Sequence, residues 1–401
     1  MTSQSVDVVI AGGGVVGHAT AWELARRDIE VLIVDRHLPG RATSASAGGL
    51  WPVGEAVGLG CGVIHQAART GSDSGDAVPA SLPAVFRDFL VESNRRFPEL
   101  AGELEDLTGV DIELDSGPGL LFLMQTARQQ AVVDNIARGL PEGFVLEILS
   151  PEEVGELEPA VCREIVGGAL LPGEDQVNPM MLAEAYKRAA LANGARFQND
   201  RLVDEILRET DRVVGVRMGE ETVACGHVVN AAGAWAGQLA ATAGITLPVE
   251  PVRGQVVLTQ ALPPLIASCL STSSCYLAQK RHGEILVGST TEHVGFDTGV
   301  TEEGIRGLCR GAVGAVPALA DVGVKRVWAG LRPGTPDEMP ILGPVAGVDG
   351  YVNVAGGFRT GIVAAPLMAR VTAQAIVGET PDVAIESYRA CLLYTSPSPR
   401  D

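Results

Sequence analysis

A cluster of glycines near the beginning of the chain has the spacing that binds the phosphates of a dinucleotide. Gly12, Gly14 and Gly17 follow the apolar run 6–11, and helix-forming sequence comes after them. In this pattern the first glycine permits a tight turn, the second lets the backbone approach a pyrophosphate, and the third lets the helix pack on the strand. The pyrophosphate binds at the helix N-terminus, where unpaired N–H groups favour an anion.

The elements around these glycines complete the pattern. The sequence predicts a helix over 16–27 and a second apolar strand over 31–34, which ends at Asp35. A carboxylate at that position can accept hydrogen bonds from ribose hydroxyls. Strand, helix, strand and acid together predict a dinucleotide site.

Three more segments are rich in small residues and could contact the same ligand. Residues 41–50 combine small side chains with hydroxyls, so they could lie along a phosphate–ribityl chain; the alternative is an ordinary surface loop. Residues 228–235 form a strand that runs into Ala-Ala-Gly-Ala-Trp. Residues 356–361 form a glycine turn before an apolar helix, which is again a helix start that favours an anion.

Together these segments resemble the flavin-dependent D-amino acid oxidase and glycine oxidase superfamily over roughly residues 6–385. The similarity is greatest to the catalytic flavin subunits of bacterial hydrogen cyanide synthases, whose relatives are opine oxidase B subunits and D-hydroxyproline dehydrogenase subunits. Six stretches carry this resemblance: 44–51, 57–62, 175–179, 275–280, 328–334 and 340–344.

The resemblance implies that the dinucleotide is FAD. At 334–337, where monomeric sarcosine oxidases carry a flavin-linking cysteine, this chain has none, so we expect non-covalent FAD. Val203 matches the position whose backbone brackets the adenine, although an ordinary core valine would look the same. The expected cofactor-binding residues are Gly12, Gly14, Val15, Val16, Gly17, Asp35, Arg36, Ser44, Ser46, Ala47, Gly48, Gly49, Leu50, Val203, Ala231, Ala232, Gly233, Trp235, Arg332, Gly356, Gly357, Phe358, Arg359, Thr360 and Gly361.

Five side chains are candidates for the catalytic end of the site. Arg332 matches the superfamily's carboxylate-binding arginine, whose guanidinium makes two parallel bonds to a carboxylate; the alternative is a surface ion pair. Tyr276 matches the tyrosine that donates to the same carboxylate, although it could be a half-buried sheet tyrosine. Arg359 either points into the site or braces the flavin. Trp51 and Glu55 follow the segment expected beside the isoalloxazine, so either could shape the substrate pocket, with packing as the alternative role of Trp51.

The resemblance implies oxidation of a small amino acid by hydride transfer from Cα to flavin N5. Glycine, oxidised through an imine to HCN and CO2, is the first hypothesis, with electrons leaving through partner subunits that carry an iron–sulfur centre and a second flavin. The second is an opine, D-hydroxyproline, proline or another secondary amine. The third is a non-catalytic FAD-bearing scaffold subunit. The 356–361 turn and the 41–50 loop disfavour a nicotinamide-dependent dehydrogenase.

Composition limits the partners and the location. Thirty basic and 49 acidic residues give a net charge of −19, which disfavours nucleic acid and an anionic membrane surface. The charge serves solubility or forms an acidic docking face. No apolar stretch approaches the roughly twenty residues of a membrane span, and no signal peptide is evident. We expect a cytoplasmic protein whose membrane association, if any, is through partners.

Cysteine and histidine spacing predicts no metal site in this chain. The seven cysteines are scattered and form no C-x-x-C pair, and the six histidines are equally dispersed. Zinc and iron–sulfur sites normally use closely spaced ligands. Scattered cysteines fit reduced thiols.

The expected fold class is α/β, with a Rossmann-like FAD-binding domain and an interleaved α+β substrate domain built on an antiparallel sheet. Local signals include a helix over 151–157 with Ser150 as its N-cap, and a strand over 201–207. We assign 1–75, 150–240 and 328–390 to the FAD-binding domain, and 76–149 and 241–327 to the substrate domain. The 391–401 tail looks non-native.

Overall fold

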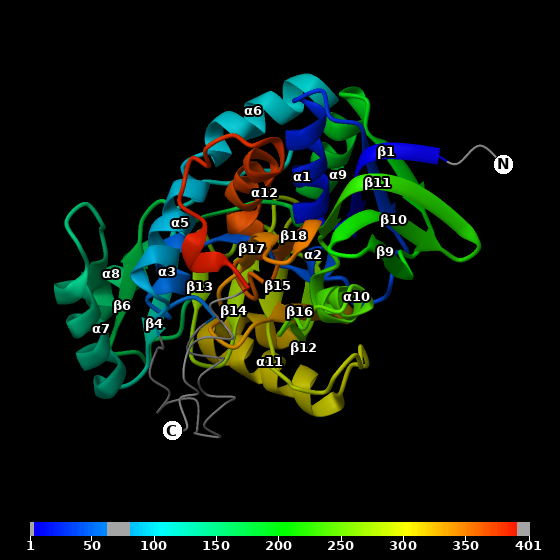
Figure 1. Ribbon diagram of the computed structural model, residues 1–401. Coiled ribbons are helices and arrows are strands. Elements are labelled where there is room, and N and C mark those ends of the chain that lie inside the picture. Colours follow the sequence, from blue (N-terminus) through cyan, green and yellow to red (C-terminus); the bar gives the residue numbers. More distant parts are fainter. Residues whose placement is uncertain (1–3, 62–80, 391–401) are drawn as a thin grey trace, which may run out of the picture.

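The computed structural model describes residues 4–61 and 81–390 and contains two large sheets (Figure 1). The 391–401 tail and the proposed boundary at 75/76 lie outside these residues. The α/β class is confirmed: one sheet is mixed with parallel strands at its centre, and the other is almost entirely antiparallel. The two sheets meet along a boundary, called the seam below, where segments distant in the sequence come together.

The first sheet begins with the predicted strand–helix–strand unit. Its central strands pair in parallel, with β1 between β2 and β11. Parallel central strands are buried on both faces and therefore read as apolar runs, as β1 and β2 do. In spatial order its strands are β17 (Ile341–Val345), β18 (Val348–Ala355), β10 (Arg212–Met218), β11 (Glu221–Asn230), β1 (Gln4–Ala11), β2 (Val31–Asp35) and β8 (Arg196–Asn199), with β9 (Glu205–Glu209) paired to β10.

Helices cover one face of this sheet and form the largest apolar core with it (Figure 1). The central helix α1 (Val15–Ala25) packs between α9 (Pro179–Ala192) and α12 (Gly361–Val377), and α5 (Ala84–Asn94) and α6 (Phe97–Thr108) lie outside them. On the other face, α10 (Ala236–Thr242) packs under β9. Because α1 and α12 are adjacent, the glycine segments that precede them, 12–14 and 356–357, are brought together.

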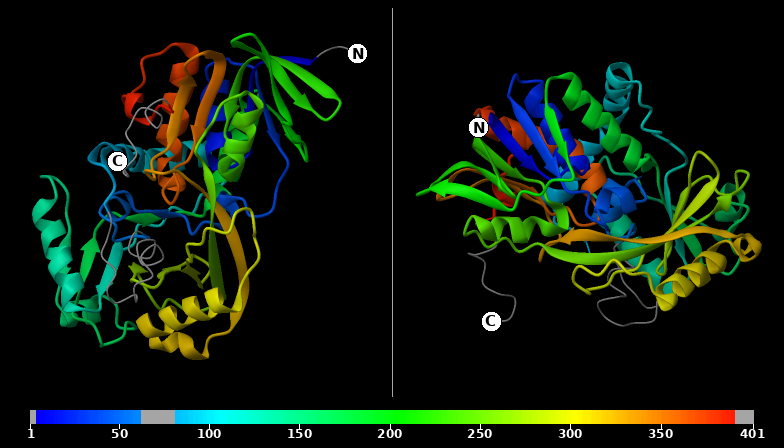
Figure 2. Two further views of the ribbon diagram at one scale, coloured as in Figure 1. Left: turned by 60° about the horizontal axis from the view of Figure 1, so that its bottom comes forward. Right: turned by 90° about the vertical axis from the view of Figure 1, so that its right-hand side faces the viewer.

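The second sheet lies across one end of the first (Figure 2). Its outer face is covered by α8 (Pro151–Leu157), α11 (Glu302–Ala315) and the 3-10 turn η3 (Pro317–Asp321), and α7 (Ala127–Gly139) lies beside β4. Its strands, in spatial order, are β16 (Val324–Gly334), β12 (Glu250–Ala261), β15 (Glu284–Gly288), β14 (Tyr276–Gln279), β13 (Cys269–Ser271), β4 (Leu120–Met124), β6 (Gly167–Leu171) and β5 (Glu147–Leu149).

Short elements connect the two layers at the seam. The 3-10 turn η2 (Gly233–Trp235), which follows β11, contacts both β12 and β16. The loop after β2 contains α2 (Ala42–Ala45), β3 (Gly49–Leu50) and α3 (Pro52–Ala56), and β3 pairs with β7 (Asp175–Gln176). Strands β6 and β16 both belong to the second sheet, where β6 pairs with β4 and β5 and β16 pairs with β12. In our assignment β6 lies wholly, and β16 partly, in segments of the FAD-binding domain. The domain division itself stays a prediction.

Of the two local predictions, the helix start at Pro151 is confirmed, whereas the strand over 201–207 is only half right. Helix α8 begins at Pro151, as predicted, with a complete capping box between Ser150 and Glu153. The strand predicted over 201–207 is wrong in its first half, because β9 begins at Glu205. Residues 201–204 form no strand. They begin beside the C-terminal end of β2, where the Arg201 N–H donates to the Asp35 carbonyl at 3.3 Å.

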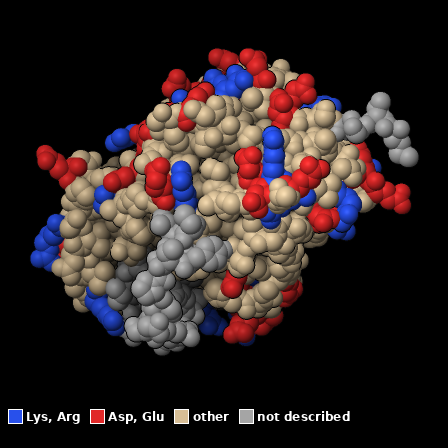
Figure 3. All heavy atoms as spheres, in the orientation of Figure 1, with Lys and Arg blue, Asp and Glu red and all other residues tan. Residues whose placement is uncertain are grey.

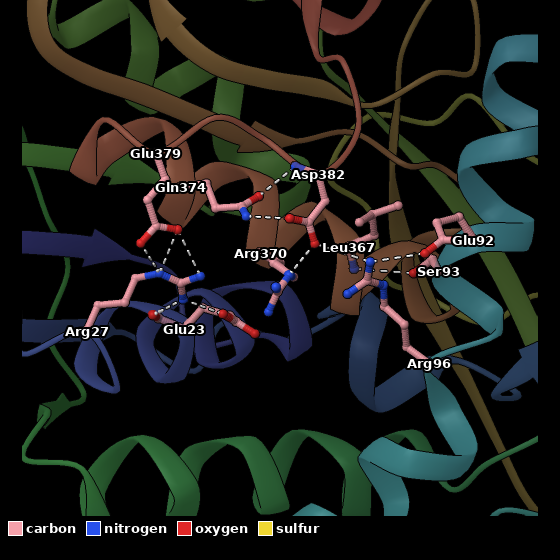
Figure 4. Close-up of polar contacts among 10 residues, drawn as sticks. All are labelled: Glu23, Arg27, Glu92, Ser93, Arg96, Leu367, Arg370, Gln374, Glu379 and Asp382. Carbon is pink, nitrogen blue, oxygen red and sulfur yellow. Dashed lines mark hydrogen bonds and ion pairs between the residues drawn. The ribbon is translucent and has the colours of Figure 1, made fainter.

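A polar network fixes α12 at its C-terminal half (Figure 4). The Asp382 carboxylate accepts from Arg370 at 2.5 Å, from Gln374 at 2.6 Å and from Arg96 of the segment between α5 and α6 at 3.3 Å. A separate ion pair joins Arg27, which follows α1, to Glu379 after α12. These contacts fix the C-terminal half of α12 against the neighbouring segments.

Surface charge is mixed on the face seen in Figure 3, where acidic and basic side chains are interspersed. Within the described ranges, none of the helices is both long and apolar enough to cross a bilayer.

Two helical glycines, Gly17 of α1 and Gly102 of α6, predict opposite outcomes for the same substitution. A Cβ on Gly17 would lie 2.0 Å from the Gly12 carbonyl oxygen, whereas nothing lies within 4 Å of a Cβ on Gly102 of α6. We expect Gly17→Ala to lower the free energy of unfolding by about 1–3 kcal/mol through overpacking. Gly102→Ala should raise it by about 0.5–1 kcal/mol because alanine is the better helix former. Denaturant unfolding of both variants checks this, and equal effects would contradict the packing.

Candidate active site

A cavity of about 620 Å³ lies along the seam, within the size range of cofactor sites. It extends from the glycine turn of α1 to the facing side of the second sheet. The predicted residues that line it are Gly12, Gly14, Val15, Val16, Gly17, Asp35, Arg36, Ser46, Ala47, Gly48, Gly49, Trp51, Glu55, Val203, Ala231, Ala232, Gly233, Trp235, Tyr276, Arg332, Gly356, Phe358, Arg359, Thr360 and Gly361. Segments separated by up to about 350 residues therefore share one site.

Three predicted cofactor residues do not line the cavity. Ser44 is exposed and its hydroxyl donates to the Arg41 carbonyl at 3.1 Å. Leu50 is fully buried in the helix-covered core, and Gly357 lies in the turn before α12 with φ of +79°. Thr43, which the sequence analysis passed over, lines the cavity in place of Ser44.

The glycine turn of α1 leaves bare backbone facing the cavity. Gly12 has φ of +115°, and a Cβ there would lie 2.3 Å from the Ala231 carbonyl oxygen. A Cβ on Gly14 would lie 3.2 Å from Thr43 Oγ1, which accepts from the Val15 N–H at 3.1 Å. A side chain at Gly12 would collide with the Ala231 backbone, and one at Gly14 would crowd Thr43. The turn therefore needs glycine, and its bare backbone, which lines the cavity, fits the phosphates of FAD.

Two helix N-termini meet at the cavity. The N-cap residues Gly14 of α1 and Thr360 of α12 make no side-chain capping bond. At α1 the Val15 N–H is accepted by Thr43, whereas the next N–H groups have no side-chain acceptor among the described residues. These groups, the first N–H groups of α12 and the two helix dipoles favour an anion at both places. The second helix start fits the charge that develops on a reduced flavin.

At the end of β2, two hydrogen bonds orient the Asp35 carboxylate, which could accept from a ribose hydroxyl. One of its oxygens accepts from the His37 N–H at 3.0 Å, and the other is 3.0 Å from Arg41 Nη1. The carboxylate is only 9% exposed and lines the cavity. This geometry fits the ribose contact that the sequence predicts.

At the opposite end, Arg332 and Tyr276 come from different strands and lie at one wall. Arg332 Nη1 donates to the Thr290 carbonyl at 3.2 Å, and Nη2 donates to Ser289 Oγ. Burial raises the pKa of the Tyr276 hydroxyl, so this group stays a donor at ordinary pH. A guanidinium and a neutral phenol side by side form a site for a carboxylate.

Two glycines make room for these side chains. A Cβ on Gly254 would lie 2.3 Å from Arg332 Nη2, and one on Gly288 would lie 2.2 Å from the Tyr276 hydroxyl oxygen. Trp51 closes the wall, its ring edge-on to Tyr276 with centroids 5.5 Å apart. Glycine within strands indicates such close approach, and this is the signal by which Gly254 and Gly288 could have been found.

A buried ion-pair network lies beside this wall. Arg359 Nη2 donates to Glu338 Oε2 at 2.7 Å, and its Nη1 lies 3.4 Å from Glu55 Oε2. The side chains of Arg359 and Glu55 are each 4% exposed. Arg359 therefore lines the cavity and is paired with two carboxylates; whether it points at the substrate or braces the flavin stays a prediction.

Lys280 braces the loop that forms the cavity's inner wall. Its ammonium donates to the Ala47 carbonyl at 2.5 Å and to Gln176 Oε1 at 2.6 Å. Desolvation lowers the pKa of Lys280 to about 8. No sequence pattern predicts a role for this lysine, which directly follows the strand that carries Tyr276.

Comparison with known proteins agrees with this geometry. Residues 7–375 match the family described as FAD dependent oxidoreductase (DAO). The chain belongs to this family, and the family defines FAD as the cofactor. Its class is therefore that of a flavin-dependent oxidoreductase.

Two curated relatives and one solved structure are particularly similar. The chain is 42% identical to hydrogen cyanide synthase subunit HcnC of Pseudomonas aeruginosa, over 99% of this chain and 98% of the relative. It is 44% identical to HcnC of Pseudomonas protegens, over 89% of each chain. The crystal structure of glycine oxidase from Geobacillus kaustophilus superposes with a TM-score of 0.85 at 29% identity, covering 97% of this chain and 99% of that one.

The lowered pKa of Lys280 predicts how stability changes in alkali. Between about pH 8 and 10.5 the unfolded chain keeps a proton that the folded chain has lost from Lys280, so this residue makes stability rise with pH. We expect the free energy of unfolding of wild type, minus that of Lys280→Met, to increase by on the order of 3 kcal/mol over this interval.

Lys325→Met is the matched control, because Lys325 is 55% exposed and pairs with Glu284 on the surface. Chemical denaturation across the pH series measures all three proteins. A wild-type minus Lys280→Met difference as flat as that of the control would rule out a depressed pKa.

Proposed function

We propose that this protein oxidises glycine to HCN and CO2 with FAD, as the flavin subunit of a hydrogen cyanide synthase. The observation that carries the proposal is one cavity in which a dinucleotide cradle leads to Arg332 and Tyr276. The 42–44% identity to the two HcnC subunits over most of the chain supports the choice of glycine. Amino acid oxidation is also the activity named for the glycine oxidase relatives at about 31% identity.

The residues at the seam would hold FAD by its phosphates and its riboses. The glycine turn and Thr43 would bind the pyrophosphate, and Asp35 the adenosine ribose. The loop 46–49 and the turn before α12 would border the flavin. When bound, FAD supplies the acceptor for the hydride that leaves the substrate Cα. We propose that it is held non-covalently, since residues 334–337 contain no cysteine to bond it.

Arg332 and Tyr276 would bind and orient the glycine carboxylate. Two charge-assisted bonds from the guanidinium and one from the phenol leave Cα as the end that faces the flavin. Trp51 and Tyr276, in edge-to-face contact, limit the space beyond Cα. Glycine has no side chain to place there, and this favours it over the bulkier opines and secondary amines.

The overall reaction removes four electrons and four protons from glycine, leaving one HCN and one CO2. The first two-electron step makes an imine, and the second gives the nitrile carbon. We propose that the electrons then pass to partner subunits carrying an iron–sulfur centre and a second flavin, as befits one subunit of a synthase. We also propose a cytoplasmic location, with any membrane association made by the partners; the described cysteines, all free thiols, support a reducing compartment.

Anaerobic reduction of the purified yellow protein tests the substrate. We expect glycine to bleach the flavin absorbance, and [2-13C]glycine with an artificial acceptor to give labelled cyanide. Bleaching only by D-alanine, L-proline or an opine would move the substrate and leave the site. No bleaching by any amine would favour the scaffold role.

Arg332→Lys tests how the carboxylate is held. Lysine keeps the charge but loses the two-pronged contact, so the glycine concentration for half-maximal reduction should rise by about tenfold to a hundredfold. Arg326→Lys, on the same strand but over the exposed face of Trp328, is the control and should change nothing. Equal behaviour of the two variants in stopped-flow reduction would contradict the assignment.

A further inference from the structure

We propose that Glu55 binds the amino group of the substrate and takes its proton before oxidation. This inference rests on the proposed oxidation of an amino acid and deepens it, by assigning the second half of the zwitterion to a residue. The carboxylate end is accounted for by Arg332 and Tyr276, whereas the ammonium end needs an acceptor of opposite charge.

Glu55 offers a free oxygen inside the cavity. Its side chain is 4% exposed and lines the same cavity as Arg332 and Tyr276. Oε1 accepts from the Cys61 N–H at 2.9 Å, but Oε2 has no hydrogen-bond partner among the described residues. A buried carboxylate oxygen without a donor is costly, so it indicates a ligand at that position.

Arg359 does not satisfy this oxygen. Its Nη1 lies 3.4 Å from Glu55 Oε2 without forming a hydrogen bond, and this nitrogen also has no other hydrogen-bond partner in the part of the chain that is described. The direct bond of Arg359 is the 2.7 Å contact to Glu338. Arg359 thus keeps Glu55 paired in charge and leaves its oxygen open to an ammonium.

The backbone holds Glu55 rigidly in this place. It lies in α3, whose first N–H groups, those of Val53 and Gly54, are accepted by Glu174 at 2.7 and 3.1 Å. A Cβ on Gly60 would lie 2.7 Å from Glu55 Oε1, so only glycine lets the following turn close over the carboxylate. A carboxylate fixed on both sides is suited to positioning a substrate.

The charged and titratable groups that face Glu55 come from several elements. Arg359 precedes α12, Arg332 and Tyr276 come from the second sheet, Cys61 follows α3, and Glu174 lies beneath it. Burial raises the pKa of the Cys61 thiol, and the carboxylate of Glu55 contributes to that rise. Burial likewise raises the pKa of Glu174 well above its usual range. Neither Cys61 nor Tyr276 is a base at neutral pH. Glu174 does not line the cavity, and its two oxygens accept from the N–H groups of Val53 and Gly54. Glu55 is therefore the proton acceptor that we propose among these groups.

The proton step balances simply. Glycine enters with an ammonium and a carboxylate, and Glu55 accepts one ammonium proton to become a carboxylic acid, leaving a neutral amine with a lone pair. Only the amine can release a hydride from Cα and become an imine. No oxidant enters this step.

Glu55→Gln tests the proposal, because the amide oxygen can still accept from the Cys61 N–H while the negative charge is lost. We expect the dissociation constant of glycine to rise about tenfold or more, since an ammonium–carboxylate bond is lost. Binding of glycolate, which has a carboxylate but no amine, should change less than about twofold. Perturbation of the oxidised flavin spectrum measures glycolate binding. For glycine, which reduces the flavin, the dependence of the anaerobic reduction rate on glycine concentration in stopped-flow experiments gives the dissociation constant.

The pH dependence of flavin reduction is the second readout. The variant should react only with glycine that has already lost its ammonium proton, so its rate should rise about tenfold per pH unit near neutrality. The wild-type rate should rise less steeply. The matched control is Glu338→Gln, which removes the other partner of Arg359 and should keep the wild-type slope.

Each outcome decides a separate claim. Unchanged glycine affinity and slope in Glu55→Gln would overturn the inference while leaving glycine oxidation intact. Equal effects in Glu338→Gln would show that the two carboxylates act only through Arg359, and would also overturn it. A wild type that no amine reduces would defeat the proposed function instead. FAD content and melting temperature of each variant show that it is folded.

Discussion

The contact between the Arg332 guanidinium and bare backbone is the constraint on which the site depends. Arg332 lies against Gly254 of the neighbouring strand β12, and its two terminal nitrogens donate to Ser289 and to the Thr290 carbonyl. These bonds compensate part of the cost of a half-buried charge and leave the rest for a ligand. We propose that a substrate carboxylate completes them.

The Arg332 charge becomes part of a larger site because the two sheets meet at the cavity. Alone, the second sheet would hold an arginine beside a tyrosine, and the first would hold a cradle for phosphates. The glycine turn before α12 and the loop between β2 and α3 close the distance between them. Two helix starts contribute positive potential along the cavity, so the protein carries an anion-binding track within a chain of net charge −19.

Local chemistry made the fold and much of the cavity predictable. Gly12 and Gly17 were recognisable because each needs a bare backbone for contacts that any side chain would block. The helix at 151–157 carried a capping box, which is a signal complete in itself. Resemblance to the family added Arg332 and Tyr276, which spacing alone could not connect.

What the sequence did not predict depends on orientation and on distant partners. Thr43 and Ser44 are adjacent on a short helix, where neighbours point about 100° apart, and only Thr43 faces the cavity. The strand predicted over 201–207 starts late because its first residues contact Asp35, a tertiary interaction. The contacts of Lys280 with Ala47 and Gln176, and of Arg359 with Glu55 and Glu338, join segments that no local pattern relates.

The most direct test of the central claim is a crystal structure of the FAD-loaded protein with glycolate bound. Our account predicts the FAD pyrophosphate at the glycine turn of α1, and the ligand carboxylate within hydrogen-bond distance of both Arg332 and the Tyr276 hydroxyl. A carboxylate bound away from Arg332, or a cofactor that does not follow the cavity, would contradict it.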